Sequence, residues 1–254
     1  MAQHSWKNLD KLPYIFGVVF IVGICLPVTI ALICERVTPY VPYISEGGGN
    51  FPEAGIFGIF IVISSYLSLN IMFLRYLVVE EMAAKVGNGL DDFLNKVSFI
   101  LGFLSTFALI VVACFPTTTV TQVHNSAAGI VCTCIVLYMN FHSWISLRMS
   151  SNKKVENIRL TITLFSSLAI VIIAIFGVLG SSQWTAEYWA GSKTPKDDGF
   201  ASYLVSASAE WILAVMFFLY LVTYIPEFKN SSLELKLKLN IENRSIPRTT
   251  VVKA

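Results

Sequence analysis

Six runs of about 20 apolar residues constrain this chain of 254 residues more than any other feature. An α-helix rises 1.5 Å per residue, so about 20 residues cross the roughly 30 Å of hydrocarbon in a bilayer. Apolar residues make up 55% of the chain and charged residues 13%, which leaves too little polar surface to cover a water-soluble domain. The runs therefore predict an all-α fold, a six-helix transmembrane bundle with spans at about 12–34, 54–79, 97–115, 123–147, 158–180 and 203–225.

The basic residues predict how this bundle is oriented. With the N-terminus in the cytosol, 15 of the 18 Lys and Arg residues flank the cytosolic side, and only Arg36, Lys193 and Lys196 lie on the other side. Basic residues near the ends of spans remain in the cytosol, so we expect both termini to be cytosolic. Arg75, His142 and Arg148 are then interpreted as anchors at the cytosolic interface.

The spans divide the chain into a single membrane domain, 1–226, and a cytosolic tail, 227–254. Leucines at every second position from Leu233 to Leu239 give part of the tail the period of a strand. With no second strand nearby, we expect this tail to be disordered. The alternative is an extended segment that adds to the sheet edge of a protein partner, and its lysines could also contact the anionic leaflet.

The outer loop between the first two spans, residues 38–53, is unusually rich in proline and glycine. Proline fixes φ and glycine permits positive φ, so the loop is predicted to be an ordered reversal rather than a helix or strand. It could be a plain connector or a lid that binds a ligand or partner. The candidate residues of this outer-loop motif are Pro42, Tyr43, Ile44, Ser45, Gly47, Pro52 and Glu53.

Glu210 is the clearest ionisable residue inside a span, about seven residues into the sixth. Such residues are costly in a membrane and are candidates for function. Helical spacing places Glu210 on a face with small side chains, which indicates close packing inside the bundle. His124 and Asn125 open the fourth span on the same outer side, so the three form a candidate intramembrane polar site. Glu210 is either a structural clamp bonded to His124 or a hydroxyl, or a contact for a lipid headgroup, a proton or an ion.

Signatures of catalysis do not occur in the sequence. It contains no Gly-x-Ser-x-Gly turn, no phosphate-binding glycine loop and no paired-histidine helix motif. We therefore expect no enzymatic activity, no catalytic residues, no cofactor and no metal site. The basic residues form no stripe interleaved with aromatic residues, which argues against nucleic acid as a partner. The expected partners are membrane lipids, with a cytosolic protein at the tail as a further candidate.

Short motifs are spread in order over the membrane region: Pro42-Tyr43-Ile44-Ser45 with Pro52-Glu53, Leu74-Arg75-Tyr76, Leu101-Gly102-Phe103, Val123-His124-Asn125 with Ala127-Ala128, and Ser208-Ala209-Glu210-Trp211. In their order and spacing they resemble those of the DRAM family, the damage-regulated autophagy modulators. Two departures stand out. Ala113-Cys114-Phe115-Pro116 replaces a Gly-Asn-Phe-Gln-type stretch that family members commonly carry after the third span. Ser126 lies where a glycine often follows the histidine and the one residue after it, here His124 and Asn125.

This resemblance implies a non-enzymatic multi-pass protein of lysosomal or endosomal membranes, rather than the plasma membrane, that modulates autophagy. The wider superfamily, which includes the Cwh-type membrane domain, implies an alternative. That alternative is a lipid-handling or phosphoinositide-kinase-regulating protein of the plasma membrane or secretory pathway. A lipid-sized polar cleft between the fourth and sixth spans would favour the alternative, whereas a tightly packed bundle would favour the first reading.

Overall fold

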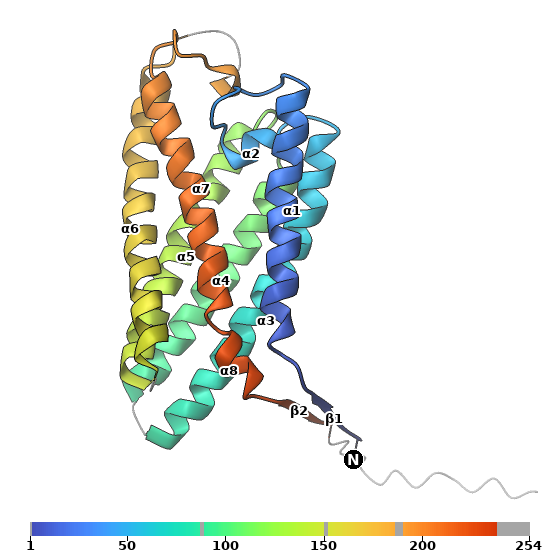
Figure 1. Cartoon of the computed structure of the whole chain (residues 1–254), viewed down its shortest axis with the longest axis vertical. Helices are drawn as coiled ribbons and strands as arrows, with labels where there is room; N and C mark the ends of the chain where they lie inside the picture. Colours follow the sequence, from blue (N-terminus) through green and yellow to red (C-terminus); the bar gives the residue numbers. More distant parts are fainter. Residues whose placement is uncertain (1, 87–88, 150–151, 186–189, 238–254) are drawn as a thin grey trace, which may run out of the picture.

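The computed structural model describes residues 2–86, 89–149, 152–185 and 190–237. Its main feature is a bundle of six long helices, which confirms the predicted all-α fold and its six apolar spans (Figure 1). Each of the six is long and apolar enough to cross a membrane. They are α1 (Lys11–Ile33), α3 (Glu53–Val86), α4 (Gly89–Cys114), α5 (Thr121–Met149), α6 (Lys153–Ser182) and α7 (Phe200–Val222).

Two helices run well past the apolar stretches that predicted them. Helix α3 continues to Val86 instead of ending near 79, and α4 begins at Gly89 instead of near 97. Met82, Ala83 and Ala84 are strong helix formers, so the helix persists after the apolar stretch ends. Most of the predicted loop between these spans is therefore helical, because apolar length reports membrane thickness rather than the end of a helix.

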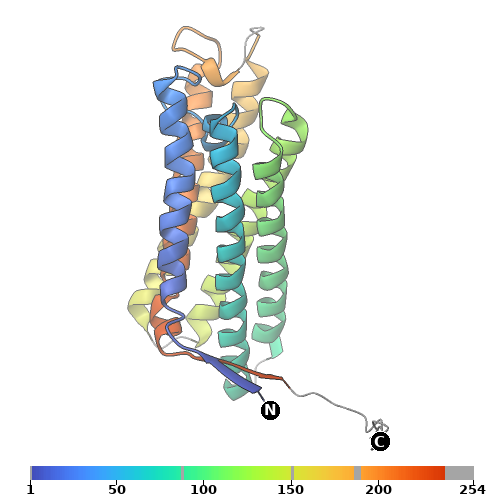
Figure 2. The same ribbon diagram turned by 90° about the vertical axis from the view of Figure 1, so that its right-hand side faces the viewer.

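The long helices pack mainly against their neighbours in sequence, and α7 closes the bundle by returning against α1. One end of the bundle, the loop end, carries the short helices α2 (Ile44–Gly47) and η1 (Ala190–Ser192). The opposite end, the terminal end, carries α8 (Ile225–Lys229) and the two strands, which contain the first and the last of the described residues (Figure 2). Aromatic rings fill the core between α1 and α7, with Phe16 stacked on Phe20 at 5.2 Å and edge-on to Phe217 at 5.8 Å between ring centroids.

The outer loop is ordered as predicted, but it contains a turn of helix that the sequence did not predict. Helix α2 begins after Tyr43, whose backbone N–H donates to the Glu46 carboxylate at 3.0 Å. This is a capping contact, and it satisfies a donor that the start of a helix leaves unpaired. The prediction of a reversal without helix is therefore wrong for Ile44–Gly47.

The segment after α7 is also more ordered than predicted. Strand β2 (Leu233–Leu237) pairs antiparallel with β1 (Ala2–Trp6), so the second strand that the sequence analysis did not find is supplied by the N-terminus. Together with α8, this corrects the prediction of a disordered tail for 227–237. Pairing between residues more than 220 positions apart leaves no signal in the local pattern of either segment. The rest of the predicted tail, 238–254, lies outside the described residues.

Candidate functional site

Glu210 binds the outer loop. The backbone N–H of Ile44, the first residue of α2, donates to the Glu210 carboxylate at 2.7 Å. The predicted helical face is confirmed, since Tyr203, Ser206 and Leu213 on the same side of α7 are buried. The carboxylate therefore contacts the N-terminus of a helical turn, where a backbone donor lacks an intrahelical partner.

His124 and Asn125 do not join Glu210, so this part of the predicted polar site is corrected. The ring Nδ1 of buried His124 lies 2.7 Å from the backbone oxygen of Phe115, and Asn125 is exposed. Counting residues from the membrane surface gives the depth of each side chain but not its direction around the bundle axis. The outer loop, rather than α5, supplies the group that binds Glu210.

A second carboxylate, that of the buried Glu46, fixes the loop from its other side. Besides the Tyr43 N–H, its Oε2 accepts a short hydrogen bond from the hydroxyl of Tyr203 on α7. The indole N–H of Trp211 donates to the backbone oxygen of Pro42 at 2.9 Å. These contacts, with the Glu210 bond, hold residues 42–47 against α7, and we refer to residues 42–48, which include the buried Gly48, as the lid.

Burial changes the acidity of groups in and beside the lid. It raises the pKa of Glu46 to about 7, although the bonds from Tyr203 and Tyr43 and the charge of Lys193 act in the opposite direction. Burial also raises the pKa of Tyr43 to about 12 and lowers that of Lys193. The Lys193 ammonium lies over the Trp184 ring and donates to the Gly180 backbone oxygen at 2.9 Å. Glu46 can therefore change its charge near neutral pH.

The outer-loop motif is divided between two places. Pro42, Tyr43, Ile44, Ser45 and Gly47 belong to the lid. Pro52 and Glu53 instead lie at the start of α3, where buried Glu53 pairs with Arg36 at 2.6 Å and so ties α3 to the segment after α1.

The lid glycines are needed for close approach. Positive φ, the reason expected from the sequence, occurs among the described glycines only at Gly199. A Cβ on Gly47 would lie 2.7 Å from the Val28 Cα, and one on Gly48 would lie 2.4 Å from the Phe57 ring. Both residues bring the lid directly onto α1 and α3.

We expect Gly47→Ala combined with Gly48→Ala to lower the melting temperature of the purified protein, since overpacking costs about 1–3 kcal/mol. Gly55→Ala is the control, because a Cβ there meets no atom within 4 Å. Equal melting temperatures for the double variant and the control would mean that the lid is a passive connector.

A cavity beneath the lid is too small for a lipid headgroup. It encloses about 110 Å³ between α1, α3, α4, α5 and α7, whereas pockets for small molecules hold about 300–1,000 Å³. Its wall is mostly apolar; the polar residues in it are Ser45, Ser68, Ser105, Thr106 and Glu210. This cavity, which α5 and α7 help to line, is therefore not the lipid-sized polar cleft that would favour lipid handling.

We expect Glu210→Gln to keep the fold, since an amide oxygen can still accept the Ile44 N–H. Glu210→Leu leaves this donor unpaired and should cost about 1–3 kcal/mol. Melting temperatures of the two variants in the same detergent test this expectation. Equal destabilisation by Gln and Leu would show that the carboxylate charge, rather than hydrogen bonding, holds the lid.

The terminal end holds a second polar cluster that the sequence analysis missed. Glu227 on α8 pairs with Arg75 of α3 at 3.0 Å and with Arg159 of α6 at 2.7 Å. Arg159 also donates to Ser146 at 2.7 Å and to the Thr223 backbone oxygen at 3.0 Å. Two guanidiniums and one carboxylate therefore join three helices.

Aromatic side chains enclose this cluster. Both guanidiniums lie close to the Tyr224 ring, with the Arg75 Cζ 5.0 Å and the Arg159 Cζ 4.8 Å from the ring centroid. His142 is fully buried, its ring centroid 4.5 Å from that of Tyr138. The interpretation of Arg75 and His142 as interfacial anchors is therefore wrong, whereas Arg148 is partly exposed and pairs with Asp91. The sequence places Arg75 and Arg159 near the ends of their predicted spans, where basic residues usually face the membrane surface. Helices α3 and α6 extend beyond the apolar runs, so both side chains lie inside the bundle, and the cluster could not be predicted.

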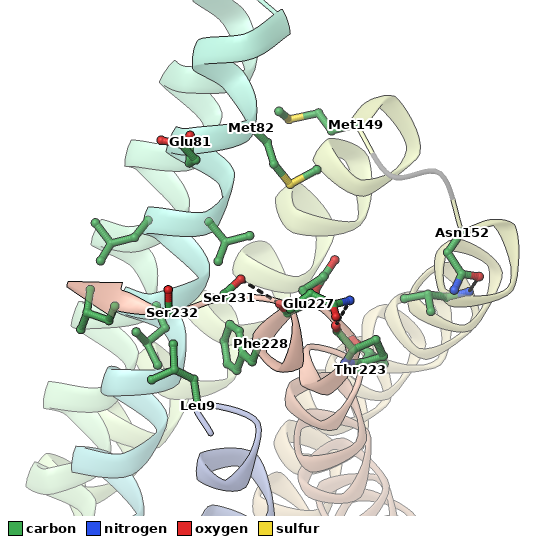
Figure 3. Close-up of a pocket in the computed structure, with 17 residues that line it drawn as sticks. Leu9, Glu81, Met82, Met149, Asn152, Thr223, Glu227, Phe228, Ser231 and Ser232 are labelled. Carbon is green, nitrogen blue, oxygen red and sulfur yellow. Dashed lines mark hydrogen bonds between the residues drawn. The ribbon is translucent and has the colours of Figure 1, made fainter. Parts of the chain in front are cut away.

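A pocket of about 760 Å³ opens beside this cluster (Figure 3). Its lining includes the apolar side chains of Met82, Met149 and Phe228 and the polar side chains of Asn152, Thr223 and Ser231. Glu227 reaches the pocket surface with 22% of its side chain exposed, while both arginines behind it are buried. The pocket is therefore amphipathic and is of a size that accepts a small molecule or several side chains.

Comparison with known proteins matches nearly the whole described bundle. The family described as Frag1/DRAM/Sfk1/Cwh43P N-terminal domain matches residues 9–231. DNA damage-regulated autophagy modulator protein 1 of Xenopus laevis is 29% identical over 94% of this chain and 99% of its own length. The human protein of the same name is 30% identical over 83% of this chain and 87% of its own. Human DNA damage-regulated autophagy modulator protein 2 is 28% identical over 83% of this chain and 80% of its own length. No solved structure matches the chain.

Proposed function

The chain belongs to the Frag1/DRAM/Sfk1/Cwh43P family, and from this premise we propose that it is a multi-pass membrane protein that modulates autophagy. The observation that carries the proposal is the similarity to proteins named as autophagy modulators, which extends over the membrane bundle and both polar clusters. We further propose that it acts in endolysosomal membranes. Its action is regulatory and non-enzymatic, through membrane lipids and a cytosolic protein partner rather than nucleic acid.

The arrangement of the lid supports a regulatory function over lipid handling at the loop end. Glu210 is engaged by the Ile44 backbone, and the cavity beside it is far smaller than a lipid headgroup requires. A protein that moves or remodels headgroups needs an accessible polar cleft, whereas a bundle closed by a tightly packed lid suits a scaffold for other proteins.

Orientation is part of the proposal. We place the terminal end in the cytosol because 15 of the 18 basic residues then lie on that side. Protease added to sealed vesicles should remove a tag placed after Ala254, while a tag inserted between Thr194 and Asp198 stays protected. Protection of the first tag and cleavage of the second would reverse the orientation.

The deciding experiment is imaging of the tagged protein against lysosomal and plasma-membrane markers, with autophagic flux measured after depletion. The proposal expects lysosomal or endosomal signal and altered flux that re-expression restores. Unchanged flux would refute the autophagy function. Plasma-membrane signal with altered flux would refute only the endolysosomal placement.

One observation favours a second candidate, lipid handling at the terminal end. The pocket of about 760 Å³ is amphipathic and large enough for part of a lipid. A photoactivatable phospholipid should then label the pocket wall, and Met82→Trp, which fills the space, should abolish labelling. Labelling that is equal in the variant would exclude this candidate.

A further inference from the structure

Glu210 uses only one of its two carboxylate oxygens to hold the lid. Its Oε2 accepts the hydrogen bond from the Ile44 N–H, and among the described residues Oε1 accepts none. Glu210 also lines the cavity of about 110 Å³ beneath the lid, together with Ile44 and Ser45. An ionisable group without a partner is costly inside a membrane bundle. The cavity therefore offers a carboxylate oxygen to a ligand.

The hydroxyl groups of the cavity wall also offer acceptors. The Ser68 hydroxyl donates to the Ser65 backbone oxygen at 3.0 Å, and the Thr106 hydroxyl donates to the Phe103 backbone oxygen at 2.9 Å. The Ser105 hydroxyl makes a longer contact of 3.5 Å with a backbone oxygen of α5. A hydroxyl whose proton is already engaged keeps its lone pairs. The polar part of the wall therefore fits a ligand that donates hydrogen bonds and carries positive charge.

The rest of the wall is apolar, and its residues include Phe20, Phe57 and Phe217. Glu210 is the only acidic residue among those that line the cavity, and no cluster of three or more His, Cys, Asp or Glu residues occurs in the described part of the chain. Divalent metal ions need about six or more oxygen ligands, which this wall does not supply. A bare alkali ion would leave the apolar wall without a partner, whereas aromatic and aliphatic side chains readily pack around an organic cation.

We propose that the cavity beneath the lid binds a small organic cation, a primary alkylammonium ion of about four or five heavy atoms. The size follows from the volume: a cavity of about 150 Å³ holds benzene, with six heavy atoms, and this one encloses about 110 Å³. The ammonium group has donors only and a charge opposite to that of Glu210, while the alkyl group fills the apolar remainder. Because Ile44 and Ser45 belong to the wall, a bound cation contacts the lid and stabilises its closed position.

Thermal melting of the full-length chain in detergent tests this proposal. Fluorescence is followed at about pH 8, where an alkylamine keeps its proton. Isobutylammonium chloride is the probe, isobutanol is its neutral counterpart of equal size, and sodium chloride supplies an inorganic cation. N-methylglucamine chloride, whose cation is too large for the cavity, gives the baseline at equal ionic strength. Isobutylammonium at about ten times its dissociation constant should raise the melting temperature by about 3–6 °C, whereas isobutanol and sodium should not.

Two variants locate the effect in the cavity. Glu210→Gln keeps an acceptor for the Ile44 N–H but removes the charge, so it should fold and lose the response to isobutylammonium. Ala214→Leu adds three carbon atoms to a residue of the cavity wall, so it should also abolish the response. Glu80→Gln and Ala201→Leu make the same changes at exposed positions and should keep the full response.

Four results would overturn the proposal. An equal shift with sodium would mean that the site takes an inorganic cation. An equal shift with isobutanol would mean that the cavity is filled without recognition of charge. A shift that persists in Ala214→Leu would place binding outside the cavity, and this variant decides the matter even if Glu210→Gln fails to fold. No shift with isobutylammonium, together with no heat of binding in a calorimetric titration, would mean that the cavity binds no such cation.

Discussion

Replacing Glu227 with alanine should destabilise the bundle by about 3–5 kcal/mol, the cost of leaving buried charges without a partner. Its carboxylate is the acceptor shared by Arg75 and Arg159, whose side chains are 2% and 0% exposed. Without it, two guanidiniums remain next to each other around Tyr224 with no counter-charge from α8. The protein is unfolded in mixed micelles by adding SDS, and the transition is monitored by tyrosine and tryptophan fluorescence. The change in the free energy of unfolding measures the loss of stability.

Glu80→Gln is the control, because this α3 carboxylate is exposed and its removal changes the net charge by the same amount. Arg75→Met combined with Glu227→Gln should recover part of the lost stability, since it removes a buried cation together with the carboxylate. Equal stability of Glu227→Ala and Glu80→Gln would mean that the terminal-end cluster is solvated and contributes nothing to folding.

The six spans could be read from the sequence because membrane thickness sets the length of an apolar run independently of tertiary contacts. The same argument could not locate Arg75 and Arg159. Their helices continue past the apolar runs, so both residues resemble interfacial anchors until packing shows them buried. Their partner Glu227 lies in a segment predicted to be disordered, and its role depends on a helix that forms only against the bundle.

The loop-end site was half predictable. The placement of Glu210 inside the bundle, bound by a hydrogen-bond donor, followed from the cost of an unpaired carboxylate in a membrane. Its hydrogen-bond partner, the Ile44 backbone N–H, could not be predicted, because every residue except proline would supply a backbone N–H at position 44. Glu46 and Tyr203 were likewise missed as a pair, since their hydrogen bond joins residues 157 positions apart.

The second large effect concerns pH, and it depends on Glu46. Burial raises its pKa from 4.5 to about 7 in the folded protein, so the folded lid binds this proton more tightly than the unfolded chain does. Between those two values the folded state holds more protons, and stability must fall as pH rises. The stabilisation that comes from the protonated Glu46 carboxyl is fully present below about pH 4.5 and is lost as pH rises through about 7. A shift of this size corresponds to about 3 kcal/mol at about 1.4 kcal/mol per pKa unit.

We therefore expect the melting temperature to be higher at about pH 5 than at about pH 8, with most of the change between these values. Glu46→Gln should remove most of this dependence, because its neutral amide stays uncharged at any pH. At about pH 8 the variant should melt above the unsubstituted protein, since it avoids a buried charge. Glu80→Gln, at an exposed site, should keep the full dependence. The titratable groups that contact or lie near Glu46 are Tyr43, Tyr203, Lys193 and Glu210.

A melting temperature that rises with pH would mean that Lys193 and the donors to Glu46 keep the carboxylate charged throughout. An unchanged dependence in Glu46→Gln would assign the effect to another group, and Glu210→Gln would then be the next variant to measure. If stability falls as pH rises, as expected, the lid is held most firmly under acidic conditions and more weakly near neutral pH. Because the proposed orientation exposes the loop end to the lumen, an acidified compartment would favour the closed lid.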